Sequence, residues 1–144
     1  REEREKEMQR EKLAELTLPC KIKTLRYVFR KSNPAVIGVR VEGGIMKAGV
    51  HMMNSDGEII DRIKAIQSQN KPVVSAKRGE EVAISLPNVT AGRQVKEDEI
   101  LFSSVSEMEF RHLKENKKLL SNDEIMILQE IARIKRKEKS TWGL

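Results

Sequence analysis

The chain has 144 residues, of which 35% are charged and 3% aromatic, so any core must be built from Val, Ile, Leu and Met. Its single cysteine excludes an internal disulfide, and its two histidines, far apart in sequence, give no metal-site spacing. Most of the net charge of +6 falls within residues 18–105, which fits an RNA partner, although an ordinary solvated surface is the stronger explanation from charge alone.

Residues 1–16 contain no glycine, proline or β-branched residue, and nearly all of them are good helix formers. Only four of their side chains are apolar enough to face a core, so the predicted helix is solvent-exposed and ends before Pro19. The chain begins at Arg1 without a methionine. We therefore interpret residues 1–17 as the end of a helix that links this domain to the rest of a longer protein.

From residue 18 to residue 105 the pattern changes to short runs of β-forming residues, separated by glycine, proline or turn signals. Short, evenly spaced strands with no helix between them are typical of a closed β-barrel. The predicted strands cover residues 21–30, 35–41, 50–53, 58–67, 73–74, 81–86 and 100–105.

Residues 106–144 return to helical spacing and predict a two-helix extension. Ser106 is followed three residues later by Glu109, and Ser121 by Glu124, which is the pattern of a capping box at the start of each helix. The second helix carries apolar residues on more than one face. The predicted fold is therefore mainly β: a closed barrel with an N-terminal linker helix and two C-terminal α-helices.

The segment over residues 40–49 carries a spaced set of Val41, Gly44, Met46 and Gly49. The two glycines are expected to bracket a tight turn, where a positive φ or a close backbone approach is needed. This set resembles the V-x-x-G-x-[IL]-x-x-G pattern in the second strand of the β-barrel modules of translational GTPases.

Three further segments resemble one branch of that family, the archaeal and eukaryotic initiation factor five-B, of which bacterial initiation factor two is a more distant relative. Residues 27–39 resemble the opening of its last barrel domain. Residues 76–85 and 92–101 resemble later strands, and residues 131–143 resemble the C-terminal extension that distinguishes these factors from the bacterial one. The resemblance covers the chain from about Pro19 to Leu144.

The resemblance implies a binding module that acts in translation initiation in the cytoplasm. It would hold the acceptor end of methionylated initiator tRNA and dock the C-terminal tail of initiation factor one-A while the ribosomal subunits join. The longer protein would use GTP and Mg, but this chain has no G-x-x-x-x-G-K-[ST] phosphate loop and is not expected to hydrolyse nucleotide. No apolar run approaches the roughly 18–20 residues that span a bilayer, so we expect no membrane partner. We also expect the domain to be a monomer.

Four residues near predicted turns are candidates for contact with the tRNA. Cations in such loops neutralise phosphates and position RNA without reading its sequence. The alternative, that they are solvated loop cations, is about as strong for each one. The candidates are Phe29, Arg30, Lys31 and Arg93.

The helix pair supplies the candidate residues for the protein partner. The family's tail ligand is acidic and hydrophobic, so apolar side chains and cations together suit it. The alternative is that the isoleucines are intramolecular core, which is the stronger reading for any single isoleucine. The candidates are Arg111, Lys114, Ile127, Ile131, Lys135, Arg136 and Trp142.

Two other function classes remain open. A generic RNA-binding barrel with no protein partner would bind RNA in a salt-dependent way and ignore aminoacylation. An enzyme would need a catalytic arrangement, and no Ser/His/Asp or Cys/His spacing suggests one.

Overall fold

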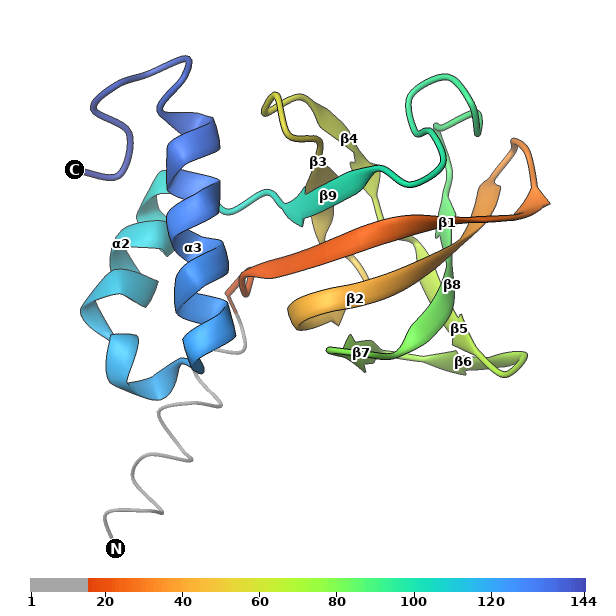
Figure 1. Ribbon diagram of the computed structural model, residues 1–144, viewed down its shortest axis with the longest axis horizontal. Helices are drawn as coiled ribbons and strands as arrows, with labels where there is room; N and C mark the ends of the chain where they lie inside the picture. Colours follow the sequence, from red (N-terminus) through yellow and green to blue (C-terminus); the bar gives the residue numbers. More distant parts are fainter. Residues whose placement is uncertain (1–15) are drawn as a thin grey trace, which may run out of the picture.

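The computed structural model describes residues 16–144. The helix predicted over residues 1–17 therefore lies outside the described residues, except for Leu16 and Thr17, which are not helical. The fold is mainly β with two α-helices at the C-terminal side, as predicted (Figure 1). The elements are β1 (Cys20–Arg30), β2 (Ala35–Lys47), β3 (His51–Met53), β4 (Ile59–Arg62), β5 (Ala65–Ser68), β6 (Lys71–Val73), β7 (Ser75–Lys77), β8 (Glu81–Leu86), β9 (Ile100–Ser103), α2 (Glu107–Glu115), η1 (Lys117–Leu119) and α3 (Asn122–Lys135).

The strands form one antiparallel sheet in the order β4-β3-β9-β1-β2-β8-β5-β6, and β7 pairs with the end of β2. No ladder of hydrogen bonds joins β4 to β6 within residues 16–144, so the predicted closed barrel is not confirmed. The predicted strand over 58–67 is two strands, β4 and β5, joined by Ile63 and Lys64. The amide of Ile63 donates to the carbonyl of Val50 and that of Lys64 to Ser85, so this link reaches both β3 and β8 sides of the sheet.

The inner face of the sheet encloses the main apolar core. Along β1, the side chains of Cys20, Ile22 and Thr24 are buried while those between them are half-buried, which is the alternation expected of a strand with one covered face. The core is aliphatic, as the composition requires. Its fully buried members include Ile22, Val39, Met46, Met52, Ile63, Ile66, Ile84, Leu86 and Leu101.

The two helices begin as predicted, each with a complete capping box. Ser106 and Glu109 cap α2, and Ser121 and Glu124 cap α3. The helices pack a second apolar core against the end of the sheet where β1 begins, with Met53 of β3 and Phe102 of β9 among its members (Figure 1). Its members are Leu18, Met53, Phe102, Val105, Phe110, Leu113, Leu120, Ile127, Leu128, Ile131, Ala132, Ile134 and Trp142.

Gly44 does not end a strand, as the sequence suggested, because β2 continues through it to Lys47. The reason is a close backbone approach: a Cβ on Gly44 would lie 2.1 Å from the carbonyl oxygen of Pro19, and its φ is +73°. Only glycine fits this position without a shift of the backbone. Gly49, with a φ of +91°, lies in the turn that follows β2.

Candidate functional site

A bulge in β1 shapes one outer face of the sheet. Thr24 pairs with Val39 and Val28 pairs with Ile37, so three residues of β1 stand opposite the single residue Gly38 of β2. A Cβ on Gly38 would lie 3.3 Å from the Cβ of Tyr27. The tyrosine therefore lies across a position that glycine leaves empty. Bulges of this kind re-aim side chains, and they are common beside functional sites.

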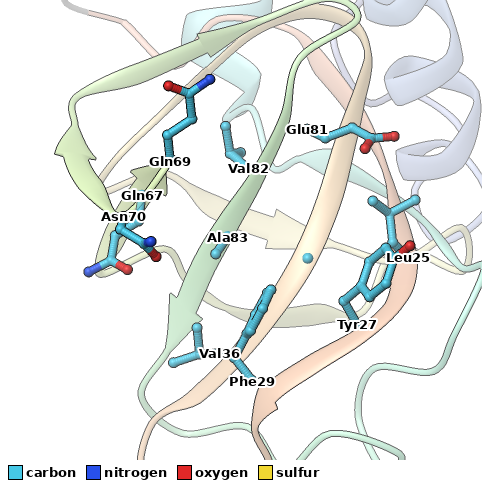
Figure 2. A pocket seen from close by; sticks show the side chains of 11 residues that line it. Leu25, Tyr27, Phe29, Val36, Gln67, Gln69, Asn70, Glu81, Val82 and Ala83 are labelled. Carbon is cyan, nitrogen blue, oxygen red and sulfur yellow. The ribbon is translucent and has the colours of Figure 1, made fainter.

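Beside Tyr27 lies an open hollow of about 440 Å³, which we call the trough. Its floor holds Gly38 and Ala83, which face each other across β2 and β8. One wall carries the rings of Tyr27 and Phe29, whose side chains are 64% and 68% exposed. Figure 2 shows these rings across β2 and β8 from the opposite wall.

The opposite wall consists of amide side chains from the β5–β6 hairpin. Gln67 lies in β5, and Gln69 and Asn70 form the turn between the strands. The φ angles of Gln69 and Asn70 are +53° and +65°, as in the two-residue turns that suit the twist of a hairpin. The turn thus places its amides along the trough, on the side away from Tyr27 (Figure 2).

This arrangement suits a planar, polar ligand. Exposed aromatic faces stack on nucleobases, and amide side chains both donate and accept hydrogen bonds at base edges. The small side chain of Ala83 leaves space on the floor beside Tyr27, which itself lies over Gly38. Single-stranded nucleic acid is the natural ligand of such a surface, because its bases are free to leave their stack.

The candidate tRNA residues lie together at the hairpin end of β1. Phe29 lines the trough, and Arg30 and Lys31 follow it, both exposed. The carbonyl of Lys31 accepts a 2.8 Å hydrogen bond from the amide of Ala91, which holds the loop of Arg93 against the hairpin. The structure therefore brings Arg93, far away in sequence, to the end of the molecule where Phe29, Arg30 and Lys31 lie.

The sequence analysis missed most of the trough, namely Tyr27, Gly38 and the three amides. Tyr27 is the only tyrosine in the chain and stands two residues from Phe29, a spacing that places both rings on one face of a strand. The aromatic wall could therefore have been predicted from the sequence. The amide wall could not, because its place beside the rings depends on which strands pair.

The candidate partner residues on the helices do not form one exposed surface. Arg111 and Lys114 are exposed on α2. Ile127, Ile131 and Trp142 are buried, with exposed fractions of 4%, 0% and 9%. The intramolecular alternative therefore holds for these three side chains.

Trp142 and the two remaining cations take part in internal contacts. The Trp142 ring lies 4.8 Å from that of Phe110, measured between centroids. Lys135 donates to the hydroxyl of Ser104 at 3.1 Å, and Arg136 Nε donates to the carbonyl of Trp142 at 2.8 Å. A shallow hollow beside them, lined by Gln129, Arg133, Arg136 and Lys137, gives α3 a basic outer surface.

Two further observations concern the chemistry of the described residues. Within residues 16–144, no three His, Cys, Asp or Glu side chains are grouped so that they would hold a metal ion. Burial raises the pKa of the Cys20 thiol to about 12, although hydrogen bonds to Ser103 oppose the shift. A thiol with so high a pKa is not a nucleophile near neutral pH.

None of the helices in the described part is long and apolar enough to cross a membrane.

Comparisons with known proteins agree on one group. Residues 18–102 match the family described as elongation factor Tu domain 4. A probable translation initiation factor IF-2 from Methanopyrus kandleri is 44% identical over 137 residues, which are 94% of this chain and 23% of the relative. The corresponding protein from Methanoculleus marisnigri is 41% identical over 148 residues, covering 99% of this chain and 24% of the relative.

Solved structures give the same picture. The crystal structure of GDP-bound aIF5B from Aeropyrum pernix matches 99% of this chain and 24% of its own, with a TM-score of 0.91 and 34% identity. The bacterial selenocysteine-specific elongation factor EF-Sec matches 60% of the chain with a TM-score of 0.50 and 23% identity, which shows a shared fold alone. The chain thus spans about a quarter of the length of the curated relatives.

Proposed function

Because the chain belongs to the elongation factor Tu domain 4 family and is a C-terminal domain of the translation initiation factor IF-2/IF5B type, we propose that it holds the acceptor end of methionylated initiator tRNA. The single-stranded end of the tRNA enters the trough, where Tyr27 and Phe29 stack on its bases. Arg30, Lys31 and Arg93 contact the phosphates beside it.

One observation carries this proposal: two exposed rings and three amide side chains line the same hollow on the outer face of the sheet. Large exposed rings cost solubility and need a reason. Stacking supplies that reason, since each stacked base contributes roughly 1–3 kcal/mol as measured by alanine substitution. The adjacent cations supply the sequence-independent part of RNA affinity.

The test is a titration of the chain with an RNA hairpin that ends in single-stranded CCA. Phe29→Ala should weaken binding about tenfold, the range expected for loss of one stacked base. Met126→Ala on α3, also an exposed side chain, is the matched control and should leave the affinity unchanged. Equal affinities for the parent and the Phe29 variant would contradict the trough as the binding site.

A generic RNA-binding module is the alternative function. It would use the same trough and cations, but its affinity for RNA would not depend on the aminoacyl group. Titration of charged and uncharged forms of the same RNA separates the two, because only the initiation-factor function predicts tighter binding of the charged form. Both functions predict that affinity falls with salt.

We also propose that the helix pair docks the acidic C-terminal tail of initiation factor one-A. The exposed cations Arg111, Lys114 and Arg133 and the half-buried Lys135 and Arg136 support it through charge complementarity. The buried Ile127, Ile131 and Trp142 would support the surface from beneath. Calorimetry with the tail peptide should show binding that Lys114→Glu weakens, whereas Lys71→Glu on β6 should not.

For the longer protein, we propose that it hydrolyses GTP with Mg in a part outside this chain, and that it acts on the cytoplasmic ribosome during subunit joining. Homology to translation factors supports this assignment. A preparation of this chain alone should release no phosphate from GTP. Phosphate release that persists through further purification would contradict the proposal that GTP hydrolysis takes place outside this chain.

The division into residues 18–105 and 106–144, and closure of the first part as a barrel, are also proposals. The family match over residues 18–102 supports the boundary, and the hydrogen bonds of Ile63 and Lys64 support closure through the β4–β5 link. In a closed barrel these two amides exchange as slowly as those of β2. Fast exchange at both would contradict closure.

A further inference from the structure

A cleft of about 380 Å³ lies between the sheet and the helix pair, at the opposite end of β1 from the trough, and we call it the junction cleft. One wall comes from the end of β2 and the β7–β8 turn, and the other from η1 and the start of α3. Gly44 in this cleft pairs with Cys20, the first residue of β1, whereas Phe29 stands near the last. At roughly 3.3 Å per residue, the cleft and the trough are up to about 30 Å apart. The lining includes Gly44, Lys77, Arg78, Leu119, Asp123 and Glu124.

Exposed cations stand on both walls of the junction cleft. Lys77 and Arg78 lie on the sheet wall. Lys117 and Lys118 come directly before Leu119, which lines the helix wall. Within residues 16–144, none of these four cationic side chains takes part in an ion pair. An anion that enters the cleft therefore meets unpaired positive charge from two sides.

The two carboxylates in the lining are engaged by the start of α3. Asp123 accepts hydrogen bonds from the amide of Gly44, at 2.8 Å, and from the hydroxyl of Ser121. Glu124 is only 2% exposed and accepts a 3.0 Å hydrogen bond from the amide of Ser121. Because both carboxylates are bound to donors of the protein itself, the four exposed cations determine the charge that a ligand meets.

The turn that carries Arg78 is fixed to β2 by backbone hydrogen bonds. The amide of Gly79 donates to the carbonyl of Val41 at 2.8 Å, and the amide of Val41 donates to the carbonyl of Glu80 at 3.0 Å. The Glu80 carboxylate accepts a 2.9 Å hydrogen bond from the amide of Lys77. On the other wall, η1 is closed by backbone hydrogen bonds of its own. Both walls are therefore formed before a ligand binds, and only side chains lose freedom on binding.

We propose that the junction cleft binds the sugar-phosphate backbone of double-stranded RNA, as a second RNA surface distinct from the trough. No aromatic ring lines it, whereas single strands bind largely by stacking their bases on such rings. Duplex RNA keeps its bases paired and offers phosphates and 2′-hydroxyls, which cations on two fixed walls suit. Ile45 and Leu119, both half-buried, are the only aliphatic side chains in the lining, so an acidic, apolar protein tail has little to pack against.

The experiment titrates the chain with a blunt RNA duplex of about 16 base pairs, the length that duplex-binding domains span. This probe has no single-stranded end for the trough. Arg78→Gln and Lys118→Gln should each weaken binding several-fold and lower the slope of log K against log salt by roughly one. Lys71→Gln, at an exposed lysine of β6 outside the cleft, is the matched control and should change neither quantity. Circular dichroism checks that each variant is folded.

The outcomes separate this inference from the proposed function. Phe29→Ala should weaken binding of the CCA hairpin but not of the blunt duplex, so either site can fail while the other stands. No binding of the duplex by the parent, or equal affinities for the parent and both cleft variants, would overturn the inference. An equal loss in Lys71→Gln would also overturn it, because the attraction would then be diffuse. Polyglutamate probes the other class of partner: tighter binding than the duplex, lost in Arg78→Gln, would assign the cleft to an acidic protein.

Discussion

The carboxylate of Asp123, in the first turn of α3, accepts a 2.8 Å hydrogen bond from the backbone amide of Gly44 in β2. This contact joins the helix pair to the sheet across 79 residues of sequence. Beside it, a Cβ on Gly43 would lie 2.7 Å from Cδ1 of Ile127, so the helix packs directly on the backbone of β2. The first turns of α3 therefore pack against the backbone of two adjacent glycines.

Removal of that carboxylate should destabilise the whole domain. A hydrogen bond to a charged group contributes roughly 1.5–3 kcal/mol, and partial exposure of Asp123 reduces this, so Asp123→Ala should cost about 1–2 kcal/mol. Denaturant unfolding measures it. Asn122→Ala, one residue earlier and exposed, is the control and should cost less than half as much.

The same contacts make stability depend on pH. The Gly44 amide, followed by the Ser121 hydroxyl, lowers the pKa of Asp123 below its ordinary value of 3.8. Burial raises the pKa of Glu109, but amides of Thr17 and Ser106 outweigh it and hold the pKa below 4.5. A carboxyl whose pKa is lowered by folding stabilises the fold above its ordinary pKa and loses that contribution as the pH falls through the folded value.

We therefore expect the free energy of unfolding to fall as the pH drops below about 4.5, within the range where these carboxyls take up protons. The difference between the parent and Asp123→Ala should shrink over the same range. Unfolding curves at pH 7 and at successively lower pH values measure both. A difference that stays constant down to the acid limit would show that the charge of Asp123 contributes nothing.

Gly38→Val should impair RNA binding through Tyr27. The new side chain begins 3.3 Å from the Cβ of Tyr27, so the tyrosine must shift from its position over Gly38. We expect at least fivefold weaker binding to the CCA hairpin, with a stability cost of about 1–3 kcal/mol for overpacking. In a Tyr27→Ala background the same substitution should have a much smaller effect on affinity, and a double-mutant cycle tests this coupling.

Two glycines with similar φ angles should respond differently to alanine. Gly44 at +73° faces the Pro19 carbonyl, whereas Gly79 at +89° has no atom within 4 Å of its added Cβ. Gly79→Ala therefore carries only the backbone penalty of about 1–2 kcal/mol. Gly44→Ala adds a steric clash and should cost clearly more, or prevent folding. Equal unfolding free energies for the two variants would contradict the close approach at Gly44.

Ile131 and Met126 lie on different sides of α3, and their substitution by alanine should change the stability by different amounts. Ile131 is fully buried, so Ile131→Ala should cost about 2–5 kcal/mol through a core cavity. Met126 is 66% exposed, and Met126→Ala should change stability by less than about 0.5 kcal/mol. Thermal unfolding of both variants measures the difference. A small effect of Ile131→Ala would contradict the burial of this side chain and favour an exposed groove on this face of α3.

The parts of the fold that the sequence predicted correctly are those set by local chemistry. The two capping boxes follow from residues three apart, and the positions of most strands follow from runs of β-forming residues bounded by turns. The predicted end of β2 was wrong because Gly44 is required for a close approach to the Pro19 backbone, which no local pattern reveals. The split of residues 58–67 into β4 and β5 likewise depends on which strands the chain meets on either side.

The candidate site was predictable in its charges but not in its shape. Arg30, Lys31 and Arg93 could be chosen as loop cations from the sequence, but the sequence did not show that the hydrogen bond from Ala91 to Lys31 brings Arg93 beside the other two. The bulge that turns Tyr27 over Gly38 arises from non-local register. For the isoleucines of α3, periodicity showed two apolar stripes, but the burial of both depended on how the helix pair meets β9 and the segment around Trp142.

The position of α3 along β1 has a consequence for ligand binding. Lys21, the second residue of β1, pairs with Glu130 of α3 at 3.4 Å, whereas Phe29 and Arg30 are the last two residues of the strand. Figure 1 shows α3 beside the start of β1 and far from its other end. Eleven residues at roughly 3.3 Å each separate the ends of β1 by up to about 35 Å. A protein tail on the helices and an RNA end on the hairpin would therefore not compete for space, and the domain would act as a rigid bridge that carries both at once.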